Sequence, residues 1–217
     1  MRLTTKAARD DAGFTLIELL LVVVITTVIV IPLGESLILY FKNTDATSAR
    51  MTLSNDGQIS AAYLARDVAA LGLRDFATTG TGGTIPFKSS IQLDAAYDAG
   101  GQVCGTSATP VAKIRLLADD WDSSTSPATR YTRIVAYYLA PNGAVSELHR
   151  LVCTGSGATT DIVLAHNVDP STFAVSCAGP ATCDGATVPQ TVTLAFTVTA
   201  PGADPYPITL VGHRRQQ

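Results

Sequence analysis

One carboxylate, Glu18, stands at the start of a long apolar segment. From residue 14 to residue 33 no other side chain is ionisable. A carboxylate carried to the middle of a bilayer costs about 2.5–3.5 kcal/mol on insertion scales, so an acidic residue in such a segment is usually explained by a partner or a function. The chemistry that this pattern offers is charge pairing, and Glu18 needs a cationic partner.

The apolar segment has the length of a membrane-spanning helix. About 20 consecutive apolar residues cross the hydrocarbon core of a bilayer, and residues 14–33 reach that length. A secretory signal peptide would carry a small-residue cleavage site after its apolar region, whereas the chain after Leu33 soon returns to an apolar pattern. We therefore expect the segment to be retained as a single-pass anchor in the cytoplasmic membrane.

Six residues around this carboxylate resemble a known processing signal. Residues 13–18 (Gly-Phe-Thr-Leu-Ile-Glu), followed by an apolar helix, are similar to the cleavage and methylation signature of type IV prepilins and of the pseudopilins of type II secretion. The resemblance implies that a membrane prepilin peptidase cuts between Gly13 and Phe14 and methylates the new amino group of Phe14. It also implies that Glu18 pairs with the free terminal amine of a neighbouring subunit.

The leader that this cut would remove, residues 1–13, departs from the family pattern at one place. Asp10 and Asp11 stand just before the cleavage position, where basic residues are more common. Three basic residues against these two acidic ones leave the leader with a net charge of +1, which fits a cytoplasmic side under the positive-inside rule. The alternative interpretation is an ordinary membrane anchor whose glutamate lies near the interface.

Length and composition fit one exported domain behind the anchor. We divide the 217 residues into the leader at 1–13, a long helix at 14–73 and a globular head at 74–217, with about 14–41 in the membrane or filament core. The net charge is −3 and charged residues make up 15% of the chain. This composition argues against general nucleic-acid binding through phosphate contacts, and no nucleic-acid site is expected.

Apolar periodicity predicts an α+β fold, which in the resembling family is the pilin fold. A long N-terminal α-helix, transmembrane in its first half and amphipathic in its second, is expected to pack on a C-terminal antiparallel β-rich domain. We expect Pro32 and Gly34 to kink or locally melt the helix, and residues 43–48 to be a second soft point. The predicted buried stripe of the second half is Met51, Leu53, Ile59, Ala62, Tyr63, Ala69, Ala70 and Leu73.

Eight segments after the helix have strand character. Asn142-Gly143 predicts a hairpin turn, within a loop at residues 140–144. Residues 191–198 alternate between large apolar side chains and threonine or alanine, so one face of that strand should cover the helix. The eight predicted strands are 91–93, 112–117, 132–139, 145–153, 161–165, 173–176, 191–200 and 208–211.

All four cysteines follow the apolar segment, and their even number suits disulfides on an oxidising face. Four cysteines permit three pairings. Cys177 and Cys183 enclose a short loop with a Gly-Pro turn, so we favour Cys177–Cys183 and, by elimination, Cys104–Cys153. A zinc site is the rival interpretation, but the chain has no Cys-x-x-Cys and its three histidines lack ligand spacing.

The remaining clusters offer little chemistry. Asp119, Asp120 and Asp122 place three carboxylates in a predicted loop and are the candidate calcium ligands. Their spacing matches no calcium motif, so a solvated turn is preferred, and no cofactor is expected. Neither a nucleophile elbow nor a phosphate-binding glycine loop occurs, so we do not expect an enzyme.

The predicted function is structural. The resemblance implies a subunit that is held in the membrane before assembly and in an extracellular or surface filament afterwards. Its partners would be other pilin or pseudopilin subunits, the prepilin peptidase, an inner-membrane assembly platform and, before assembly, the lipid bilayer. Residues 137–143 and 163–168 look like the minor pilin and minor pseudopilin branches.

We therefore expect a minor pilin of a type IV pilus-like filament, at the priming complex or tip, serving adhesion, motility or DNA uptake. One alternative is a minor pseudopilin of a type II secretion pseudopilus that exports proteins. A less favoured alternative is a single-pass, membrane-anchored binding domain that never polymerises.

Overall fold

A computed structural model describes residues 13, 15–72, 74, 89–124, 126–154, 157–179, 182–185, 187–201 and 203–215, and the chain divides into two compact units between Asp45 and Ala46. The predicted leader up to residue 12, Phe14 and the glycine-rich segment 78–84 lie outside the described residues.

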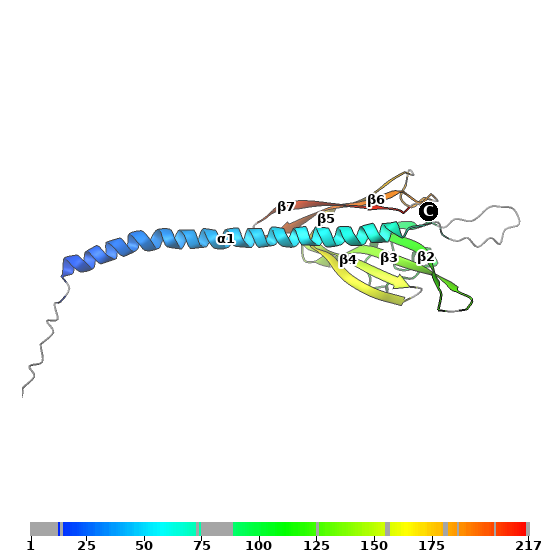
Figure 1. Ribbon diagram of the computed structural model, residues 1–217, viewed down its shortest axis with the longest axis horizontal. Helices are drawn as coiled ribbons and strands as arrows, with labels where there is room; N and C mark the ends of the chain where they lie inside the picture. The colour runs from blue at the N-terminus through cyan, green and yellow to red at the C-terminus, as the bar shows by residue number, and fades with distance from the viewer. Residues whose placement is uncertain are drawn as a thin grey trace, which may run out of the picture. The chain divides into compact units, whose positions relative to one another are not determined.

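One long helix, α1 (Leu16–Ala69), begins in the first unit and ends in the second (Figure 1). It is helical through Pro32, Gly34 and residues 43–48, so the expected local melting is wrong. A proline removes one helical donor, so the loss is confined to a single bond of a helix that continues on both sides. The Ser36 hydroxyl also donates to the Pro32 carbonyl at 2.8 Å. The helix ends at residue 69, four residues before the predicted end.

Within the described residues, seven antiparallel strands form one sheet in which every strand pairs with its neighbours in sequence, as expected for an α+β fold. In Figure 1 the second half of α1 runs between β2–β4 and β5–β7. A short 3-10 turn, Ala99–Gly101, lies in the connection between the first two strands. The strands are β1 (Ile91–Ala95), β2 (Ala112–Asp122), β3 (Thr129–Asn142), β4 (Val145–Thr154), β5 (Gly157–Ala178), β6 (Thr191–Ala200) and β7 (Ala203–His213).

Strand β5 merges two segments that the sequence separates, 161–165 and 173–176. Its first half pairs with β4 and its second half with β6, with a register shift between Asp169 and Ala174. The polar residues at this register shift are typical of a loop. In the structure they form hydrogen bonds with one another: Ser171 donates to the Asp169 carboxylate from both its amide and its hydroxyl. One strand can therefore bend and serve both halves of the sheet.

The β3–β4 hairpin is tighter than predicted. Asn142 and Val145 already pair across the strands, so the turn consists of Gly143 and Ala144 rather than residues 140–144. Gly143 has a φ of +67°, a conformation that glycine adopts without steric penalty. The asparagine-glycine signal was correct, and the strands simply run further.

The alternation predicted for 191–198 is confirmed. Val192, Leu194, Phe196 and Val198 are buried, while the residues between them are half-buried. These four side chains belong to the same core as Leu64 of α1, so this face of β6 covers the helix.

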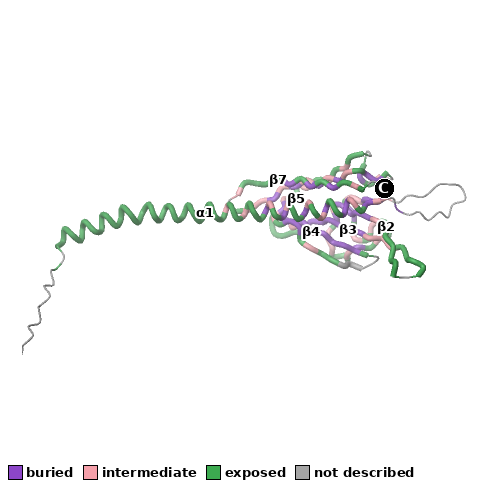
Figure 2. The backbone as a smooth tube through the Cα atoms, in the orientation of Figure 1, coloured by how far each residue is buried: buried purple, intermediate pink, exposed green. Residues whose placement is uncertain are grey.

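The buried stripe of α1 differs from the predicted one. Met51 and Ile59 are 69% and 40% exposed, so both were placed on the wrong face. Three of the side chains that do turn inward are polar, and a search for apolar residues cannot find them because their burial depends on partners in the sheet. Figure 2 shows the second half of the helix alternating between buried and exposed positions. Its buried residues are Leu53, Asp56, Ser60, Leu64, Asp67 and Val68.

A second, smaller core lies on the other face of β2–β4. It is closed by the connection between β1 and β2, which a disulfide from Cys104 to Cys153 ties to β4. The buried Arg115 of β2 holds the same connection by donating to the carbonyls of Ala96, Ala99 and Gln102. The other disulfide joins Cys177 to Cys183, so the pairing is the one that the sequence favoured.

Replacing Gly212 by alanine should destabilise the head. An added Cβ would lie 2.6 Å from the Val68 Cβ and 3.1 Å from the Leu64 carbonyl oxygen, so β7 would have to move away from α1. Overpacking of this kind costs about 1–3 kcal/mol. We expect a Tm several degrees lower by circular dichroism of the full chain in detergent. Gly72→Ala is the matched control, because no described residue lies within 4 Å of its added Cβ. Equal Tm values for the two variants would contradict this account.

The two disulfides should differ in their contribution to stability. Their cysteines are 49 and 6 residues apart, and loop closure predicts about 4 kcal/mol for the longer loop and about 2 kcal/mol for the shorter one. The double variant Cys104→Ala/Cys153→Ala should therefore unfold at a lower urea concentration than Cys177→Ala/Cys183→Ala. The reverse order of midpoints would refute the assignment of Cys104–Cys153 as the main covalent clamp.

Candidate assembly interface and helix anchor

The N-terminus of α1 carries a capping arrangement that positions Glu18. Thr15 precedes the helix, and its hydroxyl accepts the Glu18 backbone N–H at 3.3 Å. Threonine followed three residues later by glutamate is the spacing of a capping box. Glu18 is exposed in the first turn, where the helix dipole favours negative charge. The backbone of Glu18 is thus part of the helix cap, while no ion pair between described residues includes its carboxylate.

Gly13, the residue before the predicted cut, lies outside the helix and is exposed. An added Cβ would have none of the described residues within 4 Å, so no packing among them explains a glycine there. The backbone beside the predicted cleavage position is open to another protein.

The first unit presents an apolar surface that no other described part of the chain covers. Large apolar side chains from Leu16 to Phe41 are at least half exposed, from 50% at Ile25 to 83% at Leu16. The best 18-residue window of the helix has a mean hydropathy of 2.9 and no buried residue, so by length and composition α1 can cross a membrane. Exposed apolar surface of this extent indicates contact with lipid or with other apolar helices.

In the second unit α1 is fixed to the sheet by a buried carboxylate. Arg150 of β4 binds Asp67 in a bidentate manner, from Nε to Oδ2 at 2.6 Å and from Nη2 to Oδ1 at 2.7 Å. The Tyr137 hydroxyl of β3 donates to the same Oδ2 at 2.7 Å. The Asp67 side chain has no exposed surface, and its short hydrogen bonds all come from these strands. The site is an anchor between helix and sheet.

Burial and the charge of Asp67 determine the protonation of Tyr137 and Arg150. Burial, followed by the charge of Asp67, raises the pKa of Tyr137 well above its ordinary value, so the hydroxyl stays a donor. Burial acts to lower the pKa of Arg150, but its bonds to Asp67 outweigh that and the net shift is upward. Arg150 therefore remains charged.

A cation–π contact extends the anchor to the surface. The guanidinium of Arg150 lies 4.8 Å from the centre of the Tyr63 ring, and that of Arg66 lies 4.9 Å from it. Arg133 approaches Asp67 at 3.5 Å. Sequence reasoning missed this cluster; the available signal was an acidic residue, Asp67, at helical spacing from two buried apolar neighbours.

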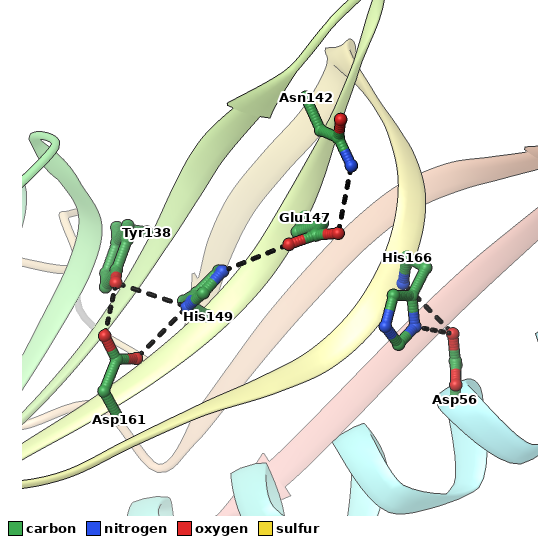
Figure 3. A network of polar contacts seen from close by, with 7 residues as sticks. All are labelled: Asp56, Tyr138, Asn142, Glu147, His149, Asp161 and His166. Carbon is green, nitrogen blue, oxygen red and sulfur yellow. Dashed lines mark hydrogen bonds and ion pairs between the residues drawn. The ribbon is translucent and has the colours of Figure 1, made fainter.

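Two further polar contacts tie α1 to β5. The Asp56 carboxylate accepts the backbone N–H of His166 at 3.0 Å and lies 3.1 Å from its Nδ1 (Figure 3). The Ser60 hydroxyl donates to the Leu164 carbonyl at 3.2 Å. The polar residues of the buried stripe are thus each paired with the sheet.

A second network joins β3, β4 and β5. Figure 3 shows the Tyr138 hydroxyl donating to Asp161 and the ring of His149 beside both residues. His149 Nε2 faces Glu147 at 3.5 Å, and Asn142 donates to the same glutamate. Burial and the bond to Asp161 raise the pKa of Tyr138 above its ordinary value. Across the part of the chain that the structure describes, no three His, Cys, Asp or Glu side chains are arranged to hold a metal.

The candidate calcium ligands do not converge. Residues 119–122 belong to β2 rather than to a loop, so neighbouring side chains point to opposite faces. Asp119 lies 3.6 Å from Arg74 and 3.9 Å from Arg130. Asp120 accepts the Trp121 N–H, and Asp122 accepts the amide and hydroxyl of Ser124, bonds that lower the pKa of Asp122.

Comparison with known proteins identifies the N-terminal part of the chain. Residues 8–34 match the family model of the prokaryotic N-terminal methylation motif. No curated protein and no solved structure matches the chain. The chain thus carries the prokaryotic N-terminal methylation motif that residues 13–18 indicated. The motif points to a structural subunit.

Removing the charge of Asp67 should uncouple the helix from the sheet. Asp67→Asn leaves Arg150 buried without a counter-charge, and breaking a buried pair in this way costs about 3–5 kcal/mol. We expect a large loss of Tm by near-ultraviolet circular dichroism. Arg66→Ala is the control, because the Arg66 side chain is 62% exposed and its pairing with Asp67 should contribute less than about 1 kcal/mol. A Tm of Asp67→Asn close to that of the control would count against the anchor.

Proposed function

We propose that this chain is a minor pilin of a type IV pilus-like filament. The observation that carries the proposal is the order of features at the N-terminus: a methylation motif, an exposed glycine, a capped glutamate and an uncovered apolar helix. Each feature suits a subunit that is first held in a bilayer and then packed against like helices.

Processing comes first in this proposal. A prepilin peptidase cuts between Gly13 and Phe14, and the new amino group of Phe14 is methylated. Cleavage creates a cation at the N-terminus of the helix, on the chain that lost its leader. The Glu18 carboxylate of a neighbouring subunit pairs with that amine, and in the low-dielectric surroundings of a helix bundle the attraction is much stronger than in water.

Assembly then replaces lipid by protein around the apolar half of α1. Because lipid tails are as apolar as leucine, packing of the helices supplies no hydrophobic gain by itself. The pairing of Glu18 and the action of an inner-membrane assembly platform must favour the filament over the bilayer. The head, with its two disulfides, suits the oxidising side of the membrane and the exterior of the filament.

The proposal that this is a minor rather than a major subunit is based on sequence resemblance. Residues 137–143 and 163–168, which look like the minor branches, lie in the β3–β4 hairpin and in β5. We place the chain at the priming complex or tip, in a filament that serves adhesion, motility or DNA uptake. A minor pseudopilin of a secretion system would carry the same motif. A gene for a retraction motor beside this gene would favour the pilin, and a gene for a secretin with protein export would favour the pseudopilin.

Neutralising Glu18 should block assembly without blocking processing. In cells that make the filament, Glu18→Ala and Glu18→Gln should leave a chain that starts at methylated Phe14 in the membrane, but at least about tenfold less of it in sheared filaments, because the amine of the neighbour stays unpaired. Mass spectrometry of membrane and filament fractions measures both quantities. Asp45→Asn is the control for loss of one negative charge on the same helix.

The site of cleavage is tested separately. Replacing Gly13 by a bulky residue should leave the leader attached, which the same mass spectra would show. Filaments that contain normal amounts of the Glu18 variants would refute the filament role, and a wild-type chain that keeps its leader would refute the processing.

A further inference from the structure

Two more charges interrupt the apolar half of α1. Between Glu18 and Asp45 the only charged residues are Glu35 and Lys42, and both are exposed. The helix is continuous through both positions. At 100° and 1.5 Å per residue, seven residues turn the helix to within about 20° of two full turns and advance it by about 10.5 Å. Glu35 and Lys42 therefore lie on one face of the helix, opposite in sign and about 10.5 Å apart.

These two side chains do not satisfy each other within one chain. On a helix, side chains three or four residues apart are neighbours, whereas side chains seven residues apart are separated by a further turn. Among the ion pairs between described residues none includes Glu35 or Lys42. Asp45, three residues beyond Lys42, is its neighbour on the helix surface, but these ion pairs include no contact between the two. Glu35 and Lys42 are both exposed and therefore open to another molecule.

We propose that Glu35 of one copy pairs with Lys42 of a neighbouring parallel copy that is displaced along the helix axis by seven residues, about 10.5 Å. The inference rests on the proposed filament function and adds that at least two copies of this chain adjoin. Copies inserted in one membrane have the same orientation, so their helices are parallel.

The charges select this displacement. With no displacement, Glu35 faces Glu35 and Lys42 faces Lys42, and both contacts are repulsive. A shift of seven residues removes both like-charge contacts and forms one opposite-charge contact, between Glu35 and Lys42. The remaining contacts are still between apolar residues. Leu33, Leu37, Ile38 and Phe41 surround the pair in sequence, and such neighbours lower the local dielectric and strengthen the attraction.

This contact is distinct from that of Glu18. Glu18 lies 17 residues before Glu35, which corresponds to about 25 Å along the axis and about 100° around it. One contact would act at the N-terminal end of the helix and the other near the end of its apolar half. Two separated contacts fix the register between neighbours more tightly than either contact alone.

A charge exchange tests the proposal in cells that make the filament. Glu35→Lys and Lys42→Glu should each reduce the processed chain in sheared filaments about tenfold, because each leaves like charges together in an apolar bundle. The double variant Glu35→Lys/Lys42→Glu should recover to within about twofold of wild type. Asp45→Asn, which removes a charge outside the pair without adding a lysine beside Lys42, should stay near wild type. A double variant no better than the single variants, or single variants that assemble normally, would overturn the pairing.

Cross-linking tests the partner and the displacement directly. All four native cysteines are in disulfides, so introduced thiols are the free ones. Cells that make Glu35→Cys and Lys42→Cys chains together should give a covalent dimer of this chain on oxidation. Glu35→Cys with Asn43→Cys should give little, because residue 43 is turned about 100° from residue 42.

The outcomes separate this inference from the function on which it rests. If the wild-type chain is present in filaments but the Glu35→Cys and Lys42→Cys chains form no covalent dimer, the pairing is wrong and the filament role stands. A cross-link to a different protein would show that the neighbour is not a second copy. If the wild-type chain never enters filaments, the proposed function itself fails.

Discussion

The fold of the head depends on a carboxylate that has no contact with water. Asp67 lies on the face of α1 that meets the sheet, and its charge is compensated by Arg150 and Tyr137 from two neighbouring strands. Such a carboxylate is tolerated only where its partners hold their geometry. The pairing therefore fixes the rotation of the helix, and with it the side chains that enter the core and those that reach the surface.

In α1 the usual pattern, apolar side chains buried and polar side chains exposed, is reversed in both halves. The first half is apolar and exposed, and the second half buries Asp56, Ser60 and Asp67. Both arrangements are explained by the position of the groups that each half can contact. The second half finds donors on its own sheet, so it can bury polar groups. The first half finds no apolar partner in the described chain, and its surface requires lipid or other helices.

Glu18 and Asp67 are two carboxylates on one helix, and each requires a counter-charge. Asp67 meets its counter-charge inside the chain, and its loss would be felt as lost stability. Glu18 is held by Thr15 in the first turn and has no counter-charge in the described residues. Its pairing, under the proposed function, is made between subunits. Under the proposed function, stability and assembly would thus depend on the same kind of charge pairing at opposite ends of the helix.

The sequence alone determined the features that depend on neighbours along the chain: the methylation motif, the apolar helix, the alternation of β6 and the turn at Gly143. Only the tertiary structure decided which residues of the second half of α1 are buried, because Asp67 and Asp56 enter the core only with partners 83 and 110 residues away. It also decided that β5 is one bent strand and that Asp119 faces away from Asp120 and Asp122. These outcomes depend on contacts between distant segments, and no local pattern of residues records them.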